Sequence, residues 1–132
     1  MPVDTVTAAN AYKSQQILTA PPETLTLMLY NGAIKFVAES IQALEAGNLE
    51  KANNTNLRAQ DIVREFMATL DMKYEISQSL FALYEYMEYR LIQGNLKKDK
   101  AQLEEVRGLL TELRDTWHTA MKLVRVPQAA GK

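Results

Sequence analysis

His118 is the single histidine of this chain, and its ring is the side chain best suited to proton transfer or metal ligation near neutral pH. Asp115 stands three residues before it, the spacing of the acid-x-x-His pairs found in di-iron helical bundles. A di-iron site needs two such pairs and two further carboxylates, so one histidine cannot complete it. The chain has no cysteine, which excludes disulfides, thiolate ligands and thiol nucleophiles. We therefore predict no metal, no cofactor and no catalytic residue.

A histidine on a helix can also accept a phosphoryl group in a signalling relay. Such a site usually has small and basic neighbours, whereas His118 follows Asp115, Thr116 and the bulky Trp117. The five glycines are scattered, with no glycine-rich turn that could hold a nucleotide phosphate. A binding module is the favoured interpretation, and histidine phosphotransfer is kept as an alternative.

Composition narrows the class of protein. The 132 residues suit one domain, and 47% hydrophobic with 23% charged residues is ordinary for a globular protein. A net charge of −1 provides no basic surface for nucleic acid. No apolar run approaches the ~20 residues of a membrane span, and the first residues lack a signal peptide pattern. We expect a cytoplasmic protein with no stable membrane insertion.

Helical periodicity predicts an all-α fold with four helices, at about 22–46, 49–71, 75–93 and 100–124. Pro22 suits a first helical residue, Gly47 suits a helix end, and Asn48 and Asp99 suit N-caps. Short connections favour an antiparallel up-down four-helix bundle over residues 21–124. Residues 1–20 are expected to form a flexible N-terminal segment or short lid helix, and 125–132 a disordered tail.

The third predicted helix has more apolar surface than a bundle core needs. Tyr84, Tyr86 and Tyr89 spread over much of its circumference, and Tyr74 stands at its start. A helix that is apolar nearly all round is either central or covered by something else. Grooves rich in aromatic residues and methionine commonly receive a partner helix. Apolar residues of the N-terminal segment could cover this groove while it is empty: Tyr12, Ile17 and Leu18.

Several segments stand in the order and at the spacing of one known family: Ala11–Tyr12, Thr19–Ala33, Arg58–Val63, Leu83–Met87, Arg90–Leu91, Asn95–Asp99, Glu104–Val106 and Arg114–Trp117. Together they resemble FliS, the family of flagellar export chaperones, over about residues 10–122. The resemblance implies a cytoplasmic chaperone that binds the disordered C-terminal segment of flagellin in apolar surface grooves. It also implies protection against premature polymerisation and delivery to a component of the flagellar export gate.

Within this resemblance, the N-terminal segment around Tyr12 is implied to occupy part of the binding surface in the free state. We predict a monomer or weak dimer whose partner-binding groove contains Ala59, Ile62, Tyr74, Leu80, Tyr84 and Met87. The lid would comprise Tyr12, Ile17 and Leu18, whereas Tyr30 and Trp117 are expected in the core. Gly94 stands where the family usually has alanine, and we expect it to end or loosen the third helix. A self-associating structural bundle is the remaining alternative.

Overall fold

Four α-helices form the computed structural model, which describes residues 22–130 and the side chains of 23–123. They are α2 (Pro22–Glu45), α3 (Leu49–Thr69), α4 (Glu75–Lys97) and α5 (Lys100–Ala130). The residues described contain no strand. The predicted lid residues Tyr12, Ile17 and Leu18 lie outside them.

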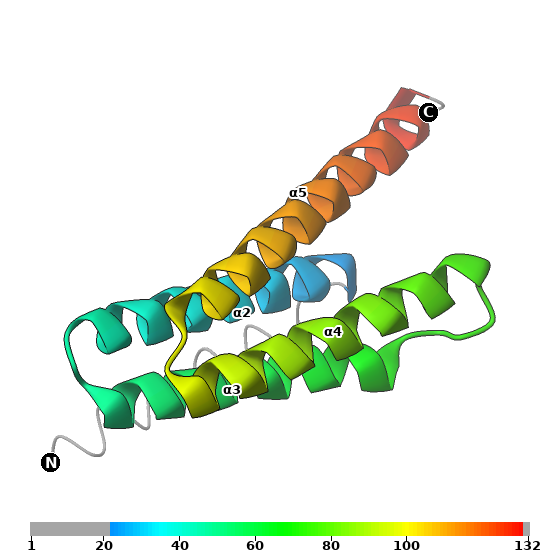
Figure 1. Ribbon diagram of the computed structural model, residues 1–132. Helices are drawn as coiled ribbons and strands as arrows, with labels where there is room; N and C mark the ends of the chain where they lie inside the picture. Colours follow the sequence, from blue (N-terminus) through cyan, green and yellow to red (C-terminus); the bar gives the residue numbers. More distant parts are fainter. Residues whose placement is uncertain (1–21, 131–132) are drawn as a thin grey trace, which may run out of the picture.

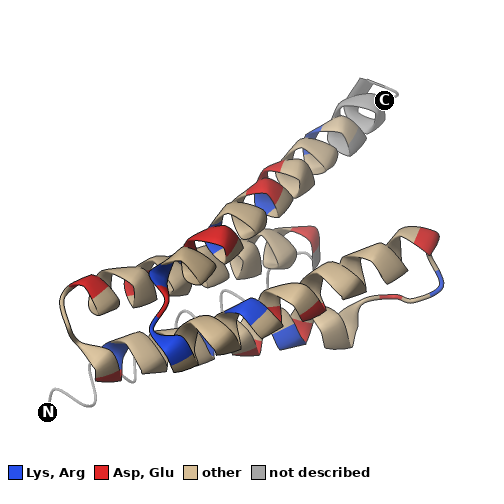
Figure 2. Ribbon diagram, viewed as in Figure 1, with Lys and Arg blue, Asp and Glu red and all other residues tan. Residues whose placement is uncertain are grey.

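Each helix packs against the one that follows it in sequence, and α5 also packs against α2. The short turns reverse the chain three times, which gives the predicted antiparallel four-helix bundle (Figure 1). In Figure 1, α5 starts beside the other helices and then extends away from them at an angle. Acidic and basic residues are interspersed along the helices, with no region of a single sign in the part described (Figure 2).

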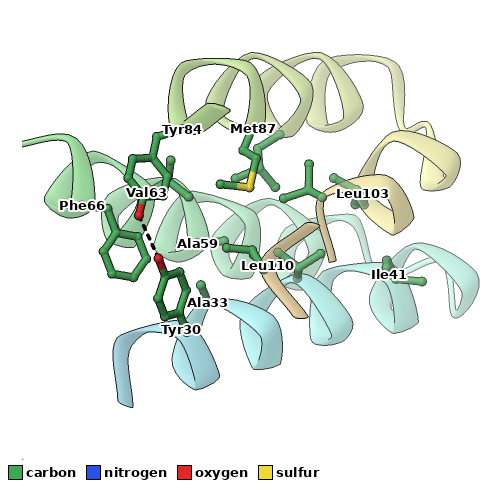
Figure 3. Close-up of a cluster of buried hydrophobic side chains, with 13 residues drawn as sticks. Tyr30, Ala33, Ile41, Ala59, Val63, Phe66, Tyr84, Met87, Leu103 and Leu110 are labelled. Atoms are coloured by element: carbon green, nitrogen blue, oxygen red, sulfur yellow. Dashed lines mark hydrogen bonds between the residues drawn. The ribbon is translucent and has the colours of Figure 1, made fainter. Parts of the chain in front are cut away.

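The core is built from one apolar face of every helix (Figure 3). Side chains with no exposed surface recur at spacings of three, four or seven residues, as in Met87 and Leu91 of α4 or Leu103, Val106 and Leu110 of α5. Because an α-helix has about 3.6 residues per turn, residues at these spacings lie on the same face. Tyr30 is buried as expected, and Trp117 is half-buried against this core.

The predicted caps hold two of the helix starts. The Asn48 Oδ1 atom accepts a hydrogen bond of 3.1 Å from the backbone N–H of Lys51, and Gly47 ends the preceding helix with a φ of 75°. Asp99 accepts from the backbone N–H of Ala101 at 3.1 Å and from the Gln102 side chain at 3.0 Å. Those contacts, with that of Gln102 the strongest, lower the pKa of the Asp99 carboxyl.

The structure corrects the expectation for Gly94. This residue does not end its helix, because α4 continues to Lys97 and stops at Lys98, whose φ is 53°. Gly94 is buried where α4 meets the start of α5, and a Cβ atom on it would lie 2.9 Å from Leu103 Cδ2 and 3.3 Å from Asp99 O. The absent side chain therefore allows the close crossing. The other ends also differ: α3 stops at Thr69, and α5 continues to Ala130, through most of the predicted tail at 125–132.

A ladder of polar side chains joins α3 to α4. Asn56 is fully buried and donates through Nδ2 to the carbonyl of Leu91 at 3.1 Å. Its Oδ1 atom accepts from Gln60 Nε2 at 2.7 Å, and Arg64 donates to Gln60 Oε1 at 3.1 Å. Arg64 also forms an ion pair with Glu88. Because every buried polar atom must find its partner, this ladder sets the register of the two helices.

Removing the buried member of this ladder should destabilise the fold. Asn56→Ala leaves the Gln60 amide in the interior without its acceptor, so we expect the free energy of unfolding to fall by roughly 1–3 kcal/mol. Asn54→Ala, at an exposed position of the same helix, should change it by less than about 0.5 kcal/mol. Urea titrations monitored by circular dichroism measure both values. Equal effects of the two substitutions would contradict the role given to Asn56.

Gly94→Ala should destabilise the bundle although alanine is the better helix former. The added Cβ atom would force Leu103 and Gln102 away from α4, and overpacking of this kind costs roughly 1–3 kcal/mol. Gly32→Ala is the matched control in α2, where the nearest atom to the new Cβ would be Ile62 Cδ1 at an ordinary 3.5 Å. The free energy of unfolding of that variant should rise by up to ~1 kcal/mol. A stabilised Gly94→Ala protein would show that the crossing needs no glycine.

Candidate partner-binding surface

The six predicted groove residues do not form one open surface in this structure. Ala59, Tyr84 and Met87 are 0–3% exposed and belong to the core. Ile62 and Leu80 are half-buried and pack against that core from outside. Tyr74, at the start of α4, is 59% exposed. The six therefore divide into three interior residues and three that have surface.

Tyr84 is held in the interior by aromatic contacts and one hydrogen bond. Its hydroxyl lies 2.8 Å from that of Tyr30, and the ring of Phe66 packs against both, at centroid distances of 4.5 Å to Tyr30 and 5.4 Å to Tyr84 (Figure 3). The hydroxyl pair satisfies both polar groups within an apolar site. Burial raises the pKa of Tyr30 and of Tyr84 above the ordinary tyrosine range.

These buried hydroxyls should make the fold sensitive to high pH. Unfolded tyrosines titrate near pH ~10, whereas the raised pKa values keep both protons in the folded state above that pH. Below pH ~10 both states keep these protons and the stability is fully present. Above pH ~10 the free energy of unfolding therefore falls, by about 1.4 kcal/mol per pH unit for each tyrosine. Tyr30→Phe removes one contribution, so its unfolding free energy should fall less steeply above pH ~10 in urea titrations. Identical slopes in the two proteins would disprove this coupling.

Four of the nine large apolar side chains that are exposed in the described part of the chain lie toward one end of the bundle: Met72, Tyr74, Ile76 and Leu123. This is the end where α2 begins, α3 ends and α4 begins, and toward which α5 runs (Figure 1). Ile76 is 67% exposed, and Leu123 of α5 is 66% exposed. We define the open-end surface as these two residues with exposed or half-buried neighbours at the same end: Met72, Tyr74, Leu80, Leu83, Leu113 and Trp117. Exposed apolar side chains that lie together on a surface are candidates for contact with a protein partner.

The second half of α5 contributes a shallow hollow to this end. The hollow measures about 400 Å³ and is lined by Thr116, Thr119, Ala120 and Leu123 together with Asp115. Two hydrogen bonds join this half of α5 to α2. Trp117 Nε1 donates to the carbonyl of Glu23 at 2.9 Å, and Arg114 donates to the Asn31 side chain at 3.2 Å. Most of its other side chains are exposed up to Leu123.

His118 lies at a second hollow of about 300 Å³ between α2 and α5, which Leu27, Asn31, Arg114 and Asp115 also line. Asp115 is paired with Arg114 at 3.1 Å rather than with the histidine. Over the described residues, no three histidine, aspartate or glutamate side chains lie close enough to share a metal ion. The same part of the chain holds no helix with the length and hydrophobicity of a bilayer span. The geometry shows no acid–histidine pair at this position.

Some exposed apolar residues were not expected from the sequence. Met72, Ile76 and Leu123 were absent from the predicted groove and are exposed in the structure. Leu96 is 72% exposed at the opposite end of the bundle. Of the tyrosines on α4, Tyr86 donates to Glu105 at 2.7 Å, and Tyr89 is exposed.

Comparison with known proteins places the chain in a family. The sequence model of the family described as "Flagellar protein FliS" matches residues 5–124. The flagellar secretion chaperone FliS of Bacillus subtilis (strain 168) is 43% identical over 115 residues, which span 87% of this chain and 86% of the relative. That of Salmonella typhimurium (strain LT2) is 34% identical, spanning 76% and 77%, and that of Escherichia coli (strain K12) is 29% identical, spanning 80% and 79%.

The fold and these matches define a chaperone rather than an enzyme. The chain belongs to the FliS family of flagellar secretion chaperones. The prediction of a non-enzymatic member of this family is confirmed.

Proposed function

We propose that this chaperone binds the disordered C-terminal segment of flagellin on its open-end surface, in the cytoplasm and as a monomer or weak dimer. Binding keeps flagellin from polymerising early, and the complex is delivered to a component of the flagellar export gate. Family membership supports the flagellar role. The observation that carries the binding site is the exposure of Tyr74, Ile76 and Leu123, which all lie toward the end of the bundle where α4 begins.

The surface has the chemistry that an unfolded segment needs. A disordered chain loses conformational entropy when it is ordered, and burial of apolar area on the partner offsets that loss. A helical piece of the segment with apolar residues at i, i+3, i+4 and i+7 would lie along α4 or α5 and cover Leu80 and Leu83. Mixed surface charge gives little long-range attraction, so affinity comes mainly from apolar contact.

The predicted groove residues then have two roles. Tyr74 and Leu80 belong to the open-end surface and contact the partner directly, and Ile62 is the third groove residue that has surface. Ala59, Tyr84 and Met87 lie beneath them and support the surface through the core. Rigid packing below a binding site fixes the positions of the side chains above it.

Tyr12, Ile17 and Leu18 act as a displaceable lid in this proposal. Leu18 precedes Pro22, the first residue of α2, by four positions, and α2 begins at the open end. An extended chain spans up to ~3.4 Å per residue, so all three side chains are within reach of the open-end surface. Flagellin would displace the lid by competition, which needs no nucleotide.

Deletion of the flagellin tail tests this function. Calorimetric titration of the purified chaperone with full-length flagellin should show a stable complex, and flagellin lacking its C-terminal segment should show none. Equal binding of both flagellins would refute the proposed mode. Light scattering of the free chaperone at the same concentration reports whether the surface is instead occupied by a second copy.

Substitutions at the open end test the site. Ile76→Ser combined with Leu123→Ser removes two exposed apolar contacts, so affinity for flagellin should fall at least roughly tenfold. Thermal stability should stay unchanged, because both side chains are already in solvent. Leu96→Ser removes an even more exposed leucine at the opposite end and should leave affinity as in the original protein. A larger loss of affinity in Leu96→Ser than in the double variant would show that flagellin binds at the opposite end instead.

A further inference from the structure

The surroundings of α5 change at about the middle of its described length. Up to Leu110 the helix contributes fully buried side chains, and beyond it most side chains are exposed or half-buried. Glu105 ties the first half to α4, because its Oε1 atom accepts from Tyr86 at 2.7 Å and from Arg90 at 2.6 Å. We call residues 100–107 the clamped half of α5 and residues 112–123 its distal half.

The distal half has a different set of neighbours. Its two hydrogen bonds to another helix in the described structure, from Arg114 and from Trp117, both go to α2. Figure 1 shows this half diverging from α4. The Gly94–Leu103 crossing and the clamp at Glu105 therefore hold the first part of α5 beside α4.

Gly108 lies between the two halves without a packing reason to be glycine. It is exposed, and a Cβ atom built on it would meet nothing within 4 Å. Its backbone is helical and shows no positive φ. Glycine weakens a helix interior relative to alanine, so the position carries local flexibility that neither sterics nor backbone geometry demands.

A second feature acts in the same helical turn. The Thr111 hydroxyl donates to the carbonyl of Arg107 at 2.8 Å, across Gly108. A hydroxyl that bonds back to the carbonyl four residues earlier competes with the helical N–H and favours bending. Two features that ease bending thus lie in one turn of α5, just beyond its hydrogen bonds to α4 at Glu105.

We propose that residues 107–111 are the bending point of α5 and that its distal half moves toward and away from α4. Movement toward α4 covers the apolar residues of the open-end surface, and movement away exposes them. The binding consequence rests on the proposed function: the same bend adjusts the surface to flagellin. Gly108 and Thr111 are positioning residues in this device, since neither needs to touch the partner.

Spin labels can measure this movement directly. Because the chain has no cysteine, two introduced cysteines would be the only sites of labelling. Ser79→Cys on α4 and Thr119→Cys on α5 place labels at exposed positions on either side of the divergence. Pulsed dipolar spectroscopy should give a broad distance distribution for this pair. Lys97→Cys with Glu104→Cys, a control pair beside the short α4–α5 turn, should give a narrow one.

Gly108→Ala should narrow the Ser79–Thr119 distribution. It should also slow amide hydrogen exchange in the distal half by roughly fivefold, the factor that corresponds to the difference in helix propensity. Gly32→Ala makes the same substitution in α2, where the new methyl group fits, and should alter neither quantity in α5. Equal breadth in the Gly108→Ala protein and the original would overturn the proposal, as would equal narrowing by Gly32→Ala.

Flagellin then tests the link to binding. A peptide of the flagellin C-terminal segment should shift the Ser79–Thr119 distances to a single narrow population and should bind more slowly to the Gly108→Ala protein. If the peptide binds neither protein, the proposed function fails while the distances in the free chaperone still decide the bending. If it binds both proteins at the same rate with unchanged distances, the bending has no part in recognition.

Discussion

The close crossing of α4 and α5 at Gly94 is the constraint on which the arrangement of the bundle depends. Leu103 packs into the space that a side chain at this position would fill, and only Lys98 and Asp99 separate the two helices. Two helices fixed so tightly at one end have their crossing angle set there. Their separation then grows toward the other end (Figure 1).

The two ends of the molecule are consequently stabilised in different ways. Near the α4–α5 turn, capping at Asp99, the clamp at Glu105 and the ladder through Asn56 satisfy polar groups and fix the register. Toward the open end, stability comes from the aromatic packing of Tyr30 and Tyr84 around Phe66. Polar contacts thus fix the bundle near one turn, and aromatic packing stabilises it toward the other end.

Much of the fold could be predicted from the sequence. Periodicity located four helices, and Asn48 and Asp99 identified two starts, because capping needs only local chemistry. The face of α4 that points into the core could not be predicted from local sequence in the same way. Apolar residues occupy most of its circumference, so spacing alone could not separate the buried Tyr84 and Met87 from the exposed Tyr89. Contacts with neighbouring helices make that choice, as they do at Gly94, where local propensity predicts a weaker helix and tertiary packing requires the glycine.

The hydrogen bond from Trp117 to the carbonyl of Glu23 gives the molecule an internal optical reporter. Trp117 is the single tryptophan of the chain, so all indole fluorescence arises from one position. That position joins the first turn of α2 to the distal half of α5, beside the open-end surface. The emission wavelength of an indole responds to the polarity around it and to its hydrogen bond. Any event that separates the two helices, or covers them, is therefore visible in unlabelled protein.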